Sequence, residues 1–111
     1  MAKTDVDRET GFMFRSKIDS DEAMLFIYQT KSPKSMWMKN CEVALDIASL
    51  SENGTVLETT SLPPEINGKT KLQSVPSFTF TKPSRIILEV KEGTFRKLGV
   101  KPGSRVYLTG Q

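Results

Sequence analysis

The sequence predicts a mostly β domain, a compact antiparallel sandwich or small barrel of six or seven short strands with two short helices. Three observations predict it. The 111 residues have the usual size of one domain, so residues 1–111 are expected to share a single core. The apolar segments have the length of strands, and none approaches the roughly 20 residues needed to cross a bilayer. Turn-forming residues separate these segments at short intervals.

The first third of the chain predicts one helix and one strand. Thr4, followed three residues later by Asp7, resembles a capping box, and the short helix it starts is weakened at Gly11. Residues 23–28 form a continuous apolar run, which is typical of a strand buried on both faces. A loop containing Pro33 is expected over residues 30–35.

The middle of the chain predicts three more strands. Two of them, residues 36–40 and 43–48, follow each other closely around Cys41. The Ser-Glu-Asn-Gly sequence at 51–54 predicts a hairpin turn, because Asn-Gly favours the turn types that match strand twist. A strand rich in β-branched residues, 55–60, follows the turn.

The last part of the chain predicts a loop, three strands and a short helix. An exposed loop is expected over residues 62–68, which contain two prolines and an Asn-Gly pair. Strands are expected at 77–81, 85–90 and 105–108. A short helix at 95–98 should close at Gly99, and the Pro-Gly order within 101–104 predicts a type II turn.

Two compositional facts restrict the chemistry. The chain has no histidine, which excludes Ser-His-Asp and Cys-His catalysis and every metal site held by histidine. Cys41 is the only cysteine, so it can form neither an internal disulfide nor a multi-thiolate metal site, and it is expected to be an inert, buried side chain. No metal and no cofactor are therefore expected. Nothing in the sequence assembles a nucleophile, base and oxyanion donors, so catalysis is not favoured.

Charge is spread unevenly along the chain. The net charge is +3; residues 1–60 hold ten acids and seven bases, whereas residues 61–111 hold three acids and nine bases. A basic half can attract nucleic acid, with Phe78 and Phe80 as stacking platforms. The alternative is that its lysines only keep the domain soluble. The polar start, residues 1–8, is not a signal peptide, so the chain as written is expected in the cytoplasm, or outside it if a signal sequence precedes Met1.

One polar cluster stands out in an apolar region. Asp46 lies within the apolar segment 44–48, where an unpaired carboxylate would be costly to bury. It is expected to have a cationic or hydrogen-bonding partner, with Lys39 and Arg15 as candidates.

Two interpretations of this cluster are open. In the first, Arg15 and Lys39 hold a small anionic ligand in a pocket that also includes Asp46, Trp37 forms a wall, and Asn40 orients the ligand. In the second, the cluster only stabilises the fold of a structural or protein-interaction module.

Arg85 and Glu89 form a second charged pair in the sequence. They share one face of a predicted strand, and they are expected to interact as a solvated pair.

Several blocks of residues resemble a known family. They are GFMFR at 11–15, AMLF at 23–26, WMKN at 37–40, LDI at 45–47, RIILE at 85–89 and GVKPG at 99–103. Their order and spacing, over about residues 2–106, resemble the domain of unknown function 192 family. The WMKN block followed shortly by Leu-Asp is the most specific part.

The resemblance implies a compact β-rich domain whose role is not established. The motif positions of the family fall on the same cluster, namely Arg15, Trp37, Lys39, Asn40 and Asp46. Family members usually begin with a β-strand before the segment that matches residues 2–15, often after a signal or lipoprotein sequence. The present sequence starts at or after that strand. Either the true start lies upstream, or a sheet edge is open to pairing with another chain.

Overall fold

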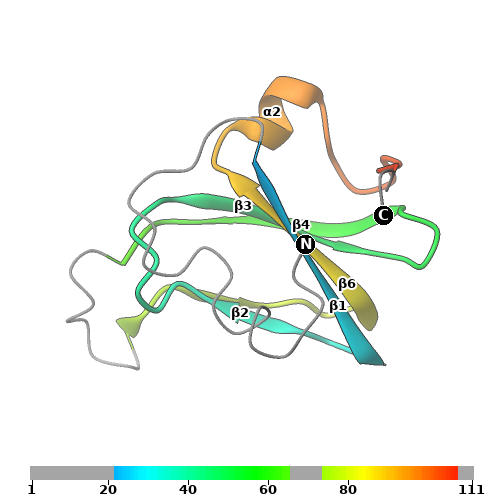
Figure 1. Cartoon of the computed structure of the whole chain (residues 1–111), viewed down its shortest axis with the longest axis horizontal. Helices are drawn as coiled ribbons and strands as arrows, with labels where there is room; N and C mark the ends of the chain where they lie inside the picture. Colours follow the sequence, from blue (N-terminus) through cyan, green and yellow to red (C-terminus); the bar gives the residue numbers. More distant parts are fainter. Residues whose placement is uncertain (1–21, 66–73, 108–111) are drawn as a thin grey trace.

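A computed structural model describes residues 22–65 and 74–107 (Figure 1). In this part of the chain, two antiparallel sheets are present. The larger sheet has the strand order β1-β6-β3-β4, and a two-stranded ribbon pairs β2 with β5. The strands are β1 (Ala23–Ser32), β2 (Ser35–Trp37), β3 (Leu45–Leu50), β4 (Val56–Leu62), β5 (Ser77–Thr79) and β6 (Ser84–Lys91), and a short helix, α2 (Thr94–Leu98), follows β6.

Strand β3 is the most deeply buried element of the larger sheet. All six of its residues are buried, because β6 and β4 pair with its two edges and other elements cover both of its faces. In its register, Asp46 lies opposite Ser61 of β4 and opposite Val90 of β6.

The larger sheet separates two apolar clusters, one on each face. The β2–β5 ribbon and the segment after β2 cover one face, and α2 covers the other (Figure 1). The ribbon-side cluster consists of Phe26, Met36, Met38, Cys41, Leu45, Ile47, Leu62, Phe80 and Ile87. The helix-side cluster consists of Leu25, Ala48, Leu50, Val56, Ile86, Val90 and Phe95. Alternation along each strand places successive residues in different clusters.

The predicted antiparallel, mostly β architecture is confirmed. Its sheets of four and two strands pack face to face and, over residues 22–65 and 74–107, do not close into a barrel. The predicted second helix is α2, and Gly99 ends it in the left-handed conformation with φ of 71°. The predicted N-terminal helix lies outside the described residues. None of the helices in the described part is long and apolar enough to span a membrane.

Both predicted tight turns are present, although the hairpin turn is not the type expected for Asn-Gly, because Gly54 has a positive φ and Asn53 does not. In the β3–β4 hairpin, the Ser51 amide donates to the Thr55 carbonyl (2.8 Å) and the Gly54 amide donates to the Ser51 carbonyl (2.9 Å). In the turn before the C-terminal segment, the Ser104 amide donates to the Lys101 carbonyl (2.9 Å). Gly103, with φ of 95°, takes the position in this turn that requires a positive φ.

Two predicted segments differ from the structure. The expected strand at 105–108 is, over its described residues 105–107, reduced to a single bridge between Arg105 and Thr55. The described segment pairs only with the end of the hairpin and the first residue of β4: the Val106 amide donates to the Gly54 carbonyl and the Val56 amide donates to the Ser104 carbonyl (2.8 Å each). The expected loop at 30–35 is also shorter, because β1 continues to Ser32 and β2 begins at Ser35.

Candidate functional site

The predicted site residues Trp37, Lys39 and Asn40 lie at the end of β2 and in the turn that follows it. Their neighbours Met36 and Met38 are buried in the ribbon-side cluster, whereas the Trp37 side chain is 52% exposed. Asn40 adopts a left-handed conformation with φ of 60°, which Asn tolerates better than most residues. Its amide donates to Glu65 Oε1 (2.8 Å), and Lys39 is partly buried in the same turn.

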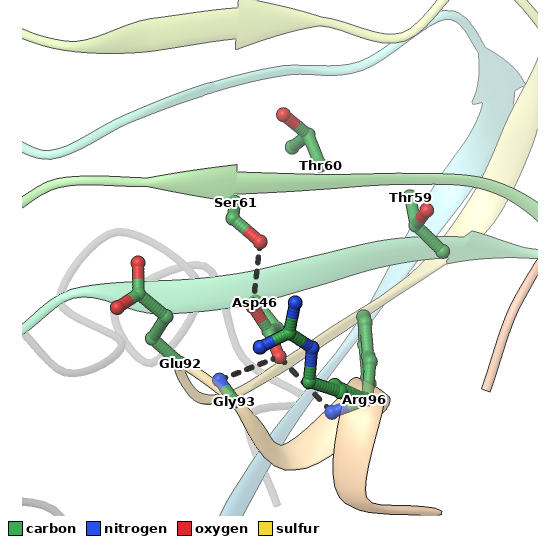
Figure 2. Close-up of a pocket in the computed structure, with 8 residues that line it drawn as sticks. Asp46, Thr59, Thr60, Ser61, Glu92, Gly93 and Arg96 are labelled. Carbon is green, nitrogen blue, oxygen red and sulfur yellow. Dashed lines mark hydrogen bonds between the residues drawn. The ribbon is translucent and has the colours of Figure 1, made fainter. Parts of the chain in front are cut away.

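Asp46 has a different environment. Only 3% of it is exposed, and its carboxylate accepts three hydrogen bonds (Figure 2). Ser61 Oγ donates to Oδ1 (2.6 Å), and the amides of Gly93 and Phe95 both donate to Oδ2 (3.0 Å each). The buried charge therefore faces one hydroxyl group and two backbone dipoles, a geometry that stabilises a carboxylate without a cation.

The structure thus divides the predicted cluster. The expectation that Asp46 has a hydrogen-bonding partner is confirmed, but Ser61, Gly93 and Phe95 supply these bonds instead of Lys39 or Arg15. The separation follows from strand alternation. Leu45 and Ile47 point toward the ribbon, so Asp46 between them points toward α2. Trp37, Lys39 and Asn40 belong to the ribbon side, and Arg15 lies outside the described residues.

An open pocket of about 420 Å³ adjoins Asp46 on the helix side of the sheet. It lies between β4 and the start of α2, and Figure 2 shows the side chains of Thr59 and Ser61 projecting from β4 toward it, while Thr60 points the other way. Its lining residues are Asp46, Thr59, Thr60, Ser61, Glu92, Gly93, Phe95 and Arg96.

The charges of this pocket lie mainly at its exposed rim. Glu92 and Arg96 are exposed and flank the opening, whereas Asp46 is buried. Because the Asp46 carboxylate already accepts three hydrogen bonds, Arg96 is the pocket side chain best able to meet an anionic group. Sequence reasoning missed Arg96, since no local pattern distinguishes it from Lys97 beside it.

Glu89 is a second buried carboxyl group, and here the sequence interpretation was wrong. Instead of forming a solvated pair with Arg85, Glu89 is only 6% exposed, and burial raises its pKa to about 7. Arg85 Nε lies 3.2 Å from Glu52 Oε2 in the β3–β4 hairpin. The missed signal is the one that revealed Asp46, an acidic residue inside an apolar strand.

Glu65 is the third buried acid, in a segment predicted to be an exposed loop. Only 2% of it is exposed; its amide donates to the Cys41 carbonyl (2.8 Å), and among the described residues its Oε2 atom has no hydrogen-bond partner. Cys41 is buried as expected, and burial raises the pKa of its thiol, with a further contribution from Glu89. Over the described ranges, these acids and the thiol do not form a group able to hold a metal ion.

The two phenylalanines suggested as nucleic-acid platforms are in fact part of the interior. Phe80 is fully buried. Phe78 is partly buried and meets Phe80 edge to face, with ring centroids 5.0 Å apart and an interplanar angle of 74°. Phe80 has no free face for base stacking, and Phe78 lies on the inner face of the ribbon, packed against the core.

Comparisons with known proteins agree with the fold and assign no activity. The family described as DUF192, "Uncharacterized ACR", matches residues 1–108. A candidate transcription regulator from Sinorhizobium meliloti 1021 is similar, with 30% identity and a TM-score of 0.78 over 94% of this chain and 75% of that chain. A protein of unknown function from Novosphingobium aromaticivorans DSM 12444 is similar with 25% identity and a TM-score of 0.79, over 96% of this chain and 71% of that one. No curated protein matches.

Proposed function

The chain belongs to the uncharacterised domain of unknown function 192 family, which assigns it no activity, so we propose its role from its geometry. We propose that it is a non-enzymatic or accessory binding domain that binds a small anionic ligand in the pocket between β4 and α2. The observation that carries the proposal is the pocket of about 420 Å³ beside Asp46. Sites for small molecules usually measure roughly 300–1,000 Å³ and contain a few converging polar groups.

The residues of the pocket favour a ligand that carries both a carboxylate and hydroxyl groups. The Arg96 guanidinium offers the paired donors that match a carboxylate. Thr59 and Ser61 bring hydroxyl groups, and the Ser61 oxygen can still accept a hydrogen bond while it donates to Asp46. Glu92, at the rim, can accept hydrogen bonds from ligand hydroxyl groups. Sugar acids combine these features.

The fixed state of Asp46 supports binding over catalysis. Its carboxylate is engaged by a hydroxyl group and two amides, so it is not a free general base. The pocket has no histidine and no cysteine. The one base that contacts a pocket hydroxyl group is the Asp46 carboxylate, which accepts from Ser61 but is also held by the amides of Gly93 and Phe95. The pocket therefore supplies recognition groups without a set of reacting groups.

The proposal can be tested by NMR titration of the ¹⁵N-labelled protein with glucuronate, gluconate, glucose and inorganic phosphate. We expect saturable shifts at the amides of Ser61, Gly93 and Arg96 with the two sugar acids, and weaker shifts with glucose. Arg96→Gln should abolish the response, whereas Lys97→Gln, on the same helix but outside the pocket lining, should preserve it. Absence of shifts across the panel, or an unchanged response in R96Q, would contradict the proposal.

The same titrations, together with a DNA-binding measurement, test the other hypotheses. Shifts confined to Trp37, Lys39 and Asn40 would favour the anion site predicted around those residues. Binding of a DNA duplex with an affinity that falls steeply with salt would favour the nucleic-acid hypothesis. The name of the Sinorhizobium protein, a candidate transcription regulator, is a reason to carry out this test. If no ligand binds, the contacts of Asp46 with Gly93 and Phe95 fit a structural or protein-interaction module.

A further inference from the structure

The β2–β5 ribbon has two chemically distinct faces. Its register pairs Met36 with Phe78 on the inner face, which packs against the ribbon-side cluster. The flanking pairs, Ser35 with Thr79 and Trp37 with Ser77, point outward, and all four of these residues are exposed. We call these four residues the outer ribbon face. It presents one indole and three hydroxyl groups.

The indole is held outward by its neighbours. Met36 is 8% exposed and Met38 is 1% exposed, so the residues on either side of Trp37 are anchored in the core. The Met38 amide also donates to the Pro76 carbonyl (2.9 Å), which fixes the backbone just after Trp37. Turning the indole inward would require both methionines to leave the core. Trp37 therefore stays on the outer side of the ribbon as a half-exposed aromatic surface.

The hydroxyl groups lie around this aromatic surface in a defined arrangement. Ser77 is directly opposite Trp37 in the register, and the Ser35 and Thr79 hydroxyl oxygens are hydrogen-bonded to each other at 2.8 Å. Each hydroxyl group can donate once and accept twice, so the bond between Ser35 and Thr79 leaves further capacity for a ligand. The outer ribbon face itself carries no ionisable side chain.

We propose that the outer ribbon face binds a neutral saccharide, with the apolar C–H face of one pyranose ring stacked on the Trp37 indole and its hydroxyl groups bonded to Ser77 and the Ser35–Thr79 pair. A sugar ring has this combination of an apolar face and a polar edge, as an amphipathic indole site requires. A single-stranded nucleic acid would also stack on the indole, but its phosphates require cations. The four residues provide none, and the two lysines nearest them in the chain, Lys34 and Lys39, already have partners of their own.

Trp37 is the only tryptophan of the chain, so its fluorescence reports on this site alone. Titration with cellotetraose and with chitotetraose should change the intensity or wavelength of the emission in a saturable way, at millimolar concentrations. Ser77→Ala should weaken binding several-fold. Tyr107→Ala, which removes an aromatic residue that is 76% exposed elsewhere, should leave the affinity unchanged.

The controls separate this site from the pocket beside Asp46. R96Q, which removes the proposed carboxylate anchor of that pocket, should not alter the tryptophan response. Trp37→Ala, followed by NMR at the Ser77 amide, should abolish saccharide binding while circular dichroism shows a folded protein. An emission that stays constant with both saccharides would overturn the proposal. So would a response to an oligothymidylate that exceeds the response to the saccharides.

Discussion

Asp46 Oδ2 accepts a hydrogen bond from the Phe95 amide at 3.0 Å, although the two residues lie 49 positions apart in the sequence. Helix α2 begins after Gly93, which has no side chain to cap the free amides of the first turn. The acceptor that a local Ser or Asp would normally supply comes instead from the neighbouring strand β3. This contact joins the helix to the centre of the sheet.

Replacing Asp46 should therefore destabilise the fold. In Asp46→Asn, one carboxylate oxygen becomes an amide group that cannot accept, so at least one of the three donors loses its partner. We expect the free energy of unfolding to fall by about 1–3 kcal/mol, the usual cost of an unsatisfied buried group. Urea denaturation measures this change. Glu92→Gln, an exposed substitution in the same pocket, should shift it by no more than about 0.5 kcal/mol, and equal losses in the two variants would disprove the role assigned to Asp46.

Burial of Glu89 should make the stability depend on pH. Its pKa rises from an ordinary value of 4.5 to about 7 in the folded protein, so between these values the native state binds the proton more tightly than the unfolded chain. Stability is then highest below the lower value and decreases as pH rises through about 7, by about 3 kcal/mol at most.

The matching variant is Glu89→Gln, which cannot ionise. Denaturation measured from pH 5 to pH 8.5 should show a smaller decrease in stability for this variant than for the wild type, and Glu89→Gln should be the more stable protein at the upper end. A wild-type curve that rises over this range, or curves with the same slope, would show that Glu89 ionises normally.

Cys41 should be chemically inert while the domain is folded. Its side chain is buried, its Sγ donates to the Val43 carbonyl (3.4 Å), and burial raises the pKa of the thiol, so little thiolate is available. Reaction with a thiol reagent such as Ellman's reagent should be slow in native buffer and rapid in urea. Fast, stoichiometric labelling of the native protein would contradict the burial.

Two glycines with similar backbone angles should respond differently to alanine. Gly54 and Gly103 have φ of 87° and 95°, so each substitution carries the cost of a left-handed residue, about 1–2 kcal/mol. A Cβ at Gly54 would also overlap the Val106 carbonyl oxygen, whereas one at Gly103 meets no atom within 4 Å. Gly54→Ala should thus lower the melting temperature clearly more than Gly103→Ala. Similar melting temperatures would mean that the C-terminal segment moves away from the hairpin.

Local features of the sequence were sufficient to predict most of the elements. Asn53-Gly54 predicted the position of the hairpin between β3 and β4, and Gly99 predicted the end of α2. An acidic residue in an apolar segment correctly indicated that Asp46 has buried hydrogen-bonding partners.

The partners themselves depend on tertiary structure. Gly93 and Phe95 reach Asp46 only because β6 pairs with β3, a long-range pairing that local periodicity does not encode. The burial of Glu65 has the same origin, since it follows from contacts with the turn at Asn40 and Cys41. Trp37 and Asp46 were predicted to share a site because they are close in the chain, but the sheet between them separates their side chains.

The order of strands in the larger sheet also bears on how the protein is made. Strand β6 lies between β1 and β3, yet it is the last of the four strands of this sheet to leave the ribosome. A nascent chain that ends before Ser84 has no strand to bridge β1 and β3, so both apolar clusters stay open during most of translation. Exposed apolar surface of this kind favours aggregation until β6 emerges and completes the sheet.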